Sequence, residues 1–369
     1  MKLSKRRLPA RPAQRGLTLI ELMVSIAIGL VVVGSVTYVY LGSKGAYRGN
    51  ESLARIQEAG RFALDSMTRD IRRAGAMGCG SLASVTSNQP VVPSVIAPAG
   101  LVVSAIQGYT PAPNYTPLPL AAPPATWTPP TPATGNLPGY WGGDILQLQI
   151  ASGVPARMST GVDTANGNIT IADNTAPNFK LNDYALVADC SSAAIFQITA
   201  TPTVTTGTIT LLSYVTGGAV PPLPPISVNT FPTVQHFDQV TYYLGKQPNG
   251  RPALYRYSLI NGGTAEEVVD NVEDMDIVYG VDTTPTDNTV SADVFQHADA
   301  VQAAGNWPNV VSVRLSLIAV GDQFGVAPQA QTFPFHGAGA ALTPTAWTAP
   351  DTRVRQVFSA SAALRDRLK

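Results

Sequence analysis

The first hydrophobic pattern along the chain is a long apolar run that passes into a helical stripe. Between Leu17 and Leu41 the only charged side chain is Glu21, and a helix of this length measures about 37 Å, enough to cross a hydrocarbon core of about 30 Å. Apolar residues then recur every three or four positions, which predicts an amphipathic helix. The stripe comprises Leu53, Ile56, Ala59/Gly60, Ala63/Leu64, Met67, Ile71 and Ala74.

The two patterns belong to one predicted helix. No proline occurs between Pro12 and Pro90, so a helix of about 90 Å can run from Leu17 to about Ala76. Gly75 and Gly78 follow the last apolar position and mark its end.

A proline-rich tract follows the helix. Thirteen prolines lie from Pro90 to Pro138, which excludes a regular helix or a central strand in this tract. The composition favours a surface loop or an extended insert, and a partner-facing arm is the alternative.

Beyond the tract, apolar and polar residues alternate with a period of two, which predicts strands. The segment from Lys246 to Arg251 contains Asn249-Gly250 and predicts a hairpin turn, and Asn261-Gly-Gly263 predicts another. We expect an α+β fold with a mostly antiparallel sheet packed on the amphipathic half of the helix. The predicted strands cover residues 144–150, 184–189, 194–199, 208–212, 240–244, 253–257, 268–279, 309–320 and 353–359.

The charge pattern indicates membrane topology and not nucleic-acid binding. Lys+Arg and Asp+Glu both number 24, so no broad field attracts nucleic acid. The low charged content indicates an extracytoplasmic, β-rich protein. Basic residues are concentrated before the apolar run, which places the N-terminus in the cytoplasm and the rest outside. They are Lys2, Lys5, Arg6, Arg7, Arg11 and Arg15.

Two cysteines are too few for a disulfide scaffold and fit no zinc spacing. If the domain is exported, a Cys79–Cys190 bridge is the natural interpretation. In the chain-entropy description, closing this loop would stabilise the folded state by roughly 4–5 kcal/mol. Two buried free thiols are the alternative.

No catalytic or metal motif is present in the sequence. His236, His297 and His336 form no tight ligand spacing, and we find no nucleophile elbow, P-loop or zincin helix. We therefore predict no enzyme activity, no cofactor and no metal. The acidic residues Asp270, Glu273, Asp274 and Asp276 match no calcium loop and are interpreted as a solvated face.

The segment Gly16-Leu17-Thr18-Leu19-Ile20-Glu21 resembles the class III signal of type IV prepilins and type II secretion pseudopilins. The resemblance implies that a prepilin peptidase cuts between Gly16 and Leu17 and methylates the Leu17 amine, where the family usually has Phe. Glu21 would then pair with the amine of a neighbouring subunit. An interfacial glutamate on a plain signal anchor is the alternative.

A second resemblance extends over nearly the whole chain, to PilW-type minor pilins. It implies a non-catalytic subunit that primes type IV pilus assembly at the filament tip, with twitching, adhesion and DNA uptake all open as uses. The segments that carry it are Arg73–Cys79, Asp183–Cys190 with Ile195–Thr199, Val272–Gly280, Val311–Leu317 and Arg353–Phe358 with Ala363–Arg367.

This resemblance sets the expected organisation and partners. The domains are a leader (1–16), a transmembrane half-helix (17–42), an amphipathic half-helix (43–78), a Pro/Ala/Thr-rich insert (79–143) and a periplasmic β-rich head (144–369). The partners are the inner membrane, the prepilin peptidase, other minor pilins, the major pilin and, as is often found, a large tip adhesin. After assembly the protein would lie in the pilus.

Two other functions stay open at this point. One is a minor pseudopilin of type II secretion, because the same signal serves both systems. The other is a single-pass anchored periplasmic enzyme or binding protein, which would keep residues 1–16 and tolerate loss of the Glu21 carboxylate.

Overall fold

The computed structural model describes most of the chain and divides it into two compact units, Met1–Glu51 and Ser52–Lys369. We call the second unit the head and describe each by itself. Leu17, Cys79 and Cys190 lie outside the described residues, so the cleavage-site leucine and the disulfide stay predictions. The described residues are 16, 18–77, 80–81, 104–111, 124, 127, 138–159, 168–172, 178–189, 193–205, 209–213, 232–260, 264–285, 289–337 and 344–364.

Helix α1 spans Leu19–Arg73, two residues shorter at its start than the sequence predicts. Thr18 precedes the helix and caps it: its Oγ1 accepts the N–H of Glu21 at 3.3 Å, and its carbonyl accepts the N–H of Leu22 at 3.1 Å. Both bonds satisfy donors that the first helical turn would otherwise leave unpaired.

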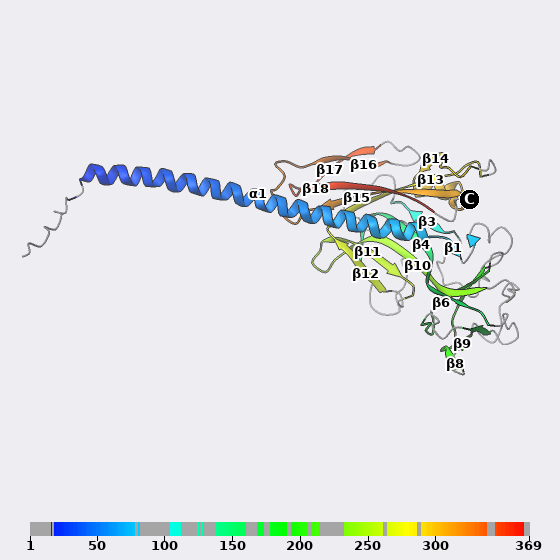
Figure 1. Ribbon diagram of the computed structural model, residues 1–369. Coiled ribbons are helices and arrows are strands. Elements are labelled where there is room, and N and C mark those ends of the chain that lie inside the picture. The colour runs from blue at the N-terminus through cyan, green and yellow to red at the C-terminus, as the bar shows by residue number, and fades with distance from the viewer. Residues whose placement is uncertain are drawn as a thin grey trace, which may run out of the picture. The chain divides into compact units, whose positions relative to one another are not determined.

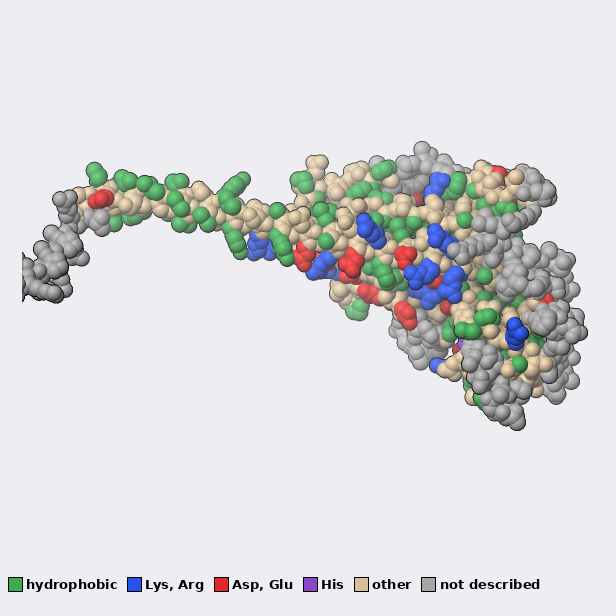
Figure 2. Space-filling model, in the orientation of Figure 1, with side chains coloured by type: hydrophobic (Ala, Val, Ile, Leu, Met, Phe, Trp, Pro, Cys, Tyr) green, Lys and Arg blue, Asp and Glu red, His purple; other side chains and the backbone are tan. Residues whose placement is uncertain are grey.

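From Leu19 to Leu41, α1 has one charged side chain, Glu21, and its large apolar side chains are exposed (Figure 2). Three of its hydroxyls are satisfied within the helix, because Ser25, Ser35 and Thr37 donate to the carbonyls of Glu21, Val31 and Val33. By length and composition, α1 is the one helix in the described ranges that can cross a membrane. These properties fit membrane anchoring.

The head contains antiparallel sheets, as the sequence predicts (Figure 1). The largest has the order β12-β11-β10-β4-β3, with β6 paired to β10 and β7 to β6; a second has the order β14-β13-β15-β18. Their strands are β3 (Ile106–Tyr109), β4 (Tyr140–Arg157), β6 (Tyr184–Ala188), β7 (Ala193–Gln197), β10 (Thr233–Lys246), β11 (Pro252–Ser258), β12 (Thr264–Asp270), β13 (Val272–Val281), β14 (Val294–Gln296), β15 (Val310–Val320) and β18 (Arg355–Ala363).

Smaller elements complete the head. Three further sheets pair β1 with β2, β16 with β17, and β5-β9-β8. The strands are β1 (Ala76–Met77), β2 (Gly80–Ser81), β5 (Asn168–Ile171), β8 (Thr203–Thr205), β9 (Ile209–Ser213), β16 (Thr332–Gly337) and β17 (Pro344–Thr348), and the short helices are α3 (Ala298–Ala303) and η2 (Trp307–Asn309).

The C-terminal part of α1 lies along both large sheets and shares their core (Figure 1). Most of the predicted stripe is buried, but Leu53 is exposed and Ser52 takes the inward position instead. Gly60 allows this close packing, because a Cβ there would collide with the ring of Phe358 on β18. The buried apolar residues that α1 adds to this core are Ala63, Met67, Ile71 and, just after the helix, Ala74.

Two local backbone signals place their turns as predicted. Gly75 follows α1 with φ +82°, and its N–H donates to the Gln149 carbonyl of β4 at 2.8 Å, which ends the helix against the sheet. Gly250, with φ +83°, donates to the Gln247 carbonyl at 2.9 Å and closes the β10–β11 hairpin.

The sequence prediction of one strand over 268–279 is wrong, because the chain forms two strands there. β12 ends at Asp270, Asn271 adopts φ +57°, and β13 begins at Val272 in the other large sheet. Asparagine tolerates this left-handed conformation better than most residues. The proline-rich tract also contributes a short strand, β3, which lies at a sheet edge and contains no proline.

The prediction of a solvated acidic face is also wrong for two of its four residues. Asp270 is exposed, but Glu273 is 4% exposed and Asp274 is fully buried. Asp274 Oδ1 accepts the N–H of Met275 at 2.8 Å, and Glu273 pairs with Arg355 of β18. Buried carboxylates need such partners, and a single strand sequence does not show them.

A buried polar clamp joins α1 to the large sheet. Asp70 of α1 is 7% exposed, and its Oδ2 accepts Tyr242 Oη at 2.9 Å and Arg256 Nε at 3.0 Å. Arg256 also lies 3.7 Å from Asp238, which Ser258 Oγ contacts at 2.8 Å. One carboxylate of α1 therefore contacts both β10 and β11.

The clamp predicts that two aspartates of α1 contribute unequally to the free energy of unfolding. Asp70→Ala should lower the free energy of unfolding by about 1.5–3 kcal/mol, because it removes buried hydrogen bonds to a charged group. Asp65→Ala should cost less than about 1 kcal/mol, because Asp65 only pairs with Arg69 on the exposed surface. Urea unfolding of the detergent-solubilised chain measures both, and equal losses would contradict the clamp.

Candidate assembly surfaces

The prepilin-like segment places one carboxylate in the first turn of an exposed apolar helix. Glu21 is the third residue of α1 and is exposed, and its own N–H is held by the Thr18 cap. Thr18-Leu19-Ile20-Glu21 has the spacing of a capping box, in which glutamate or glutamine occupies the third helical position. The capping role of Thr18 was not among the features predicted from the sequence. The Thr-x-x-Glu spacing is the sequence signal that indicates it.

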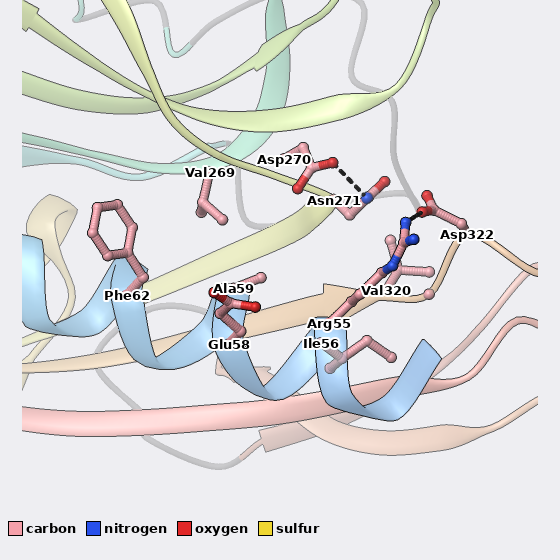
Figure 3. Close-up of a pocket in the computed structure, with 11 residues that line it drawn as sticks. Arg55, Ile56, Glu58, Ala59, Phe62, Val269, Asp270, Asn271, Val320 and Asp322 are labelled. Carbon is pink, nitrogen blue, oxygen red and sulfur yellow. Dashed lines mark hydrogen bonds and ion pairs between the residues drawn. The ribbon is translucent and has the colours of Figure 1, made fainter. Parts of the chain in front are cut away.

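A groove in the head lies between α1 and the ends of β12 and β15 (Figure 3). It has a volume of about 430 Å³. Ile56, Ala59 and Val320 form a buried apolar floor, whereas Phe62 is 57% exposed at one side. The other lining residues are Arg55, Glu58, Val269, Asp270, Asn271, Gly321 and Asp322.

Charged residues hold the rim of this groove. Asp322 pairs with Arg55 of α1 at 3.5 Å and with Arg251 of the β10–β11 turn. Asn271 Nδ2 donates to Asp270 at 3.0 Å. An apolar floor with a charged rim suits an inserted apolar side chain from another protein more than a small polar substrate. The sequence stripe includes Ile56 and Ala59 of the floor, but it does not predict the groove, because the groove needs contacts between distant segments.

An ionic network joins the start of β13 to the segment before β18. Arg355 is buried; its guanidinium contacts Glu273 and also donates to Asp351 at 2.8 Å. Arg353 donates to Asp351 twice, both times at 2.9 Å. Burial acts to raise the pKa of Asp351, but the hydrogen bonds from Arg355 and Arg353 outweigh it and lower the pKa to about 2.

The three histidines have different environments. His236 lies 3.8 Å from Asp183 and packs on Phe179, and burial lowers its pKa more than Asp183 raises it. His297 is brought to Asp144 and Asp276, a group of potential metal ligands that the sequence analysis did not expect. His336 lies in β16, and its side chain is outside the described part.

Comparison with known protein families gives two matches. The family described as "Type IV Pilus-assembly protein W" matches residues 241–366, and the "Prokaryotic N-terminal methylation motif" matches residues 11–37. Together they support a type IV pilin of the PilW type. No curated protein and no solved structure matches the chain.

The two matches cover different functional parts of the chain. The methylation motif contains Gly16, Leu17 and Glu21, and the PilW match contains the groove strands and the Glu273–Arg355–Asp351 network. Asp144 and the Asp70 end of the clamp lie outside both matched segments. Pilin-family domains are typically non-catalytic structural subunits.

The network predicts how stability depends on pH. Because the folded-state pKa of Asp351 lies below its unfolded value, its contribution is present above about pH 4 and is lost as pH falls through about 2. Asp351→Asn should therefore lower stability at pH 5 and reduce the further loss between pH 5 and pH 2. Urea midpoints over this range measure the effect.

Glu266→Gln is the matched control, because Glu266 is an exposed carboxylate on β12 away from the network. Its acid profile should follow that of the unmodified protein. An Asp351→Asn profile parallel to both would show that the network does not hold the Asp351 charge.

Proposed function

We propose that this chain is a minor pilin that primes type IV pilus assembly and lies at the filament tip. The observation that carries the proposal is the methylation motif at the head of an exposed apolar helix, with Glu21 in its first turn. The match to a pilus-assembly family over residues 241–366 favours a pilus over a type II secretion filament. The protein acts through assembly and not catalysis.

Processing is the first step of the proposal. Prepilin peptidase cuts between Gly16 and Leu17 on the cytoplasmic side and methylates the Leu17 amine. Cleavage removes the basic leader, which would otherwise hold the N-terminus at the cytoplasmic surface. The product is an apolar helix that begins with an amine, next to the Thr18 cap.

Glu21 then pairs with the Leu17 amine of a neighbouring subunit. In the bilayer, the N–H groups at the start of α1 reduce the cost of this carboxylate. Once apolar helices pack together, an amine and a carboxylate each need an opposite charge, and they find it at one axial offset. The pair therefore sets the register between subunits.

The head supplies the contacts outside the membrane. The α1 groove, with exposed Phe62 beside a buried apolar floor, is a surface suited to a neighbouring pilin or a tip adhesin. The partners are other minor pilins and the major pilin. Before assembly the chain lies in the inner membrane with its N-terminus cytoplasmic and its head periplasmic, and afterwards it lies in the pilus.

Glu21→Gln separates inter-subunit pairing from helix capping. Glutamine keeps the shape and suits the third position of a capping box, but it carries no charge. We expect normal cleavage and membrane level with a strong loss of incorporation into sheared pili, measured by quantitative immunoblot. Glu21→Ala should give the same defect.

Ser25→Ala is the control, because Ser25 lies one turn further along the same apolar helix and bonds only to the Glu21 carbonyl among the contacts found. It should incorporate normally. Normal incorporation of Glu21→Gln together with failure of Glu21→Ala would show that capping, and not charge pairing, is the role of Glu21.

A further inference from the structure

Three potential metal ligands from separate elements meet inside the head. Asp144 lies near the start of β4, Asp276 in the middle of β13, and His297 between β14 and α3. One ligand atom from each lies within 4.8 Å of the other two. The pairing of β13 with β14 explains why the three residues come together. β14 pairs with β13 only from Tyr279 onward, so the edge of β13 before Tyr279 is open to β4 and to His297, which follows β14.

Backbone and side-chain contacts hold the three groups in place. Asp144 Oδ2 accepts the N–H of Ile277 at 2.7 Å, which fixes this carboxylate against the open edge of β13. His297 Nδ1 lies 3.5 Å from Asp276 Oδ1. Asp144 and His297 are 2% and 1% exposed, and the Asp276 side chain is 15% exposed. The group is therefore buried and ordered by its surroundings.

A second observation points to a ligand at this place. Neither ring nitrogen of His297 makes a hydrogen bond in the described part of the chain, and neither does the hydroxyl of fully buried Tyr279. Buried polar groups are nearly always partnered by protein, water or an ion. Burial is the main cause of a raised Tyr279 pKa, and the charges of Asp144 and Asp276 raise it further.

The space at Tyr279 is kept by its neighbours. A Cβ on Gly108 of β3 would collide with the Tyr279 hydroxyl, so only glycine leaves room for it there. Trp307 packs edge-on against the ring with centroids 4.9 Å apart. Gly108 and Trp307 therefore fix the position of the Tyr279 ring and its hydroxyl.

We propose that Asp144, Asp276 and His297 bind one divalent transition-metal ion, with Zn²⁺ as its representative. One imidazole nitrogen and two carboxylate oxygens suit such an ion better than Ca²⁺ or Mg²⁺, which prefer oxygen ligands throughout. The two negative charges balance the ion. Tyr279 is placed to hydrogen-bond a water in the remaining coordination position.

The three ligand atoms need to move only slightly toward one another to bind an ion. Three ligands at about 2.0–2.2 Å from one ion stand about 3–4 Å apart, so a triad within 4.8 Å closes by roughly an ångström on loading. The bound ion would tie β4 of the largest sheet to β13 of the second sheet. Its role is structural, to stabilise the head, and it is independent of the proposed function.

The test uses the full chain, purified in detergent with a tag that contains no histidine. After removal of metal with EDTA, the protein is equilibrated with ZnCl₂, and bound zinc is measured by mass spectrometry and by competition with a chromophoric chelator. We expect one zinc per chain and a higher melting temperature with zinc. X-ray absorption should show only nitrogen and oxygen in the first shell.

The variants test the assigned ligands. Asp276→Asn and His297→Gln should weaken zinc binding by more than about 100-fold, because even loss of a group that only orients a ligand lowers affinity about 10–100-fold. His236→Gln is the matched control, because His236 is also a buried histidine, 3.8 Å from Asp183. The His236→Gln variant should bind zinc as tightly as the unmodified protein.

Two results would overturn the proposal. The first is that the unmodified chain retains no zinc, or that Asp276→Asn and His297→Gln retain as much as His236→Gln. The second is sulfur in the first shell, which would assign the zinc to Cys79 and Cys190. The absorption measurement uses the unmodified protein and therefore stands even if a variant fails to fold.

Discussion

The structure depends on one constraint: a helix that is apolar on every side has to be covered. From Leu19 to Leu41 the large apolar side chains of α1 are exposed within the chain itself. Burial of apolar surface is worth about 25 cal/mol per Å², so such a helix belongs in lipid or against other helices. A protein that moves from a membrane into a filament of packed helices satisfies this requirement in both places.

The same helix meets a different requirement in the head. There its stripe joins the core of both large sheets, and Asp70 adds charged hydrogen bonds to Tyr242 and Arg256. These contacts hold the second part of α1 to the folded domain. A helix with an exposed apolar start and an end that belongs to the core of the head is consistent with a pilin of the PilW type.

The sequence predicted those parts of the fold whose signals are local. The apolar run and the stripe have clear periods, and Gly75 and Gly250 mark turns that need a left-handed backbone. The sequence did not predict the burial of Glu273, because its partner Arg355 is 82 positions away. It also missed strand β3 inside the proline-rich tract and the break at Asn271, where a single residue moves the chain between sheets.

The candidate sites show the same division. Glu21 stands out because a charge interrupts an apolar run, and the groove and the Asp144–Asp276–His297 group do not, because their members come together only in the fold. The central claim of the proposed function is that the chain is a processed pilin subunit. Intact mass and N-terminal analysis of the protein from membranes with and without prepilin peptidase tests it directly. The account predicts a chain that begins with N-methyl-Leu17 only when the peptidase is present; a chain that keeps residues 1–16 in both strains would contradict it.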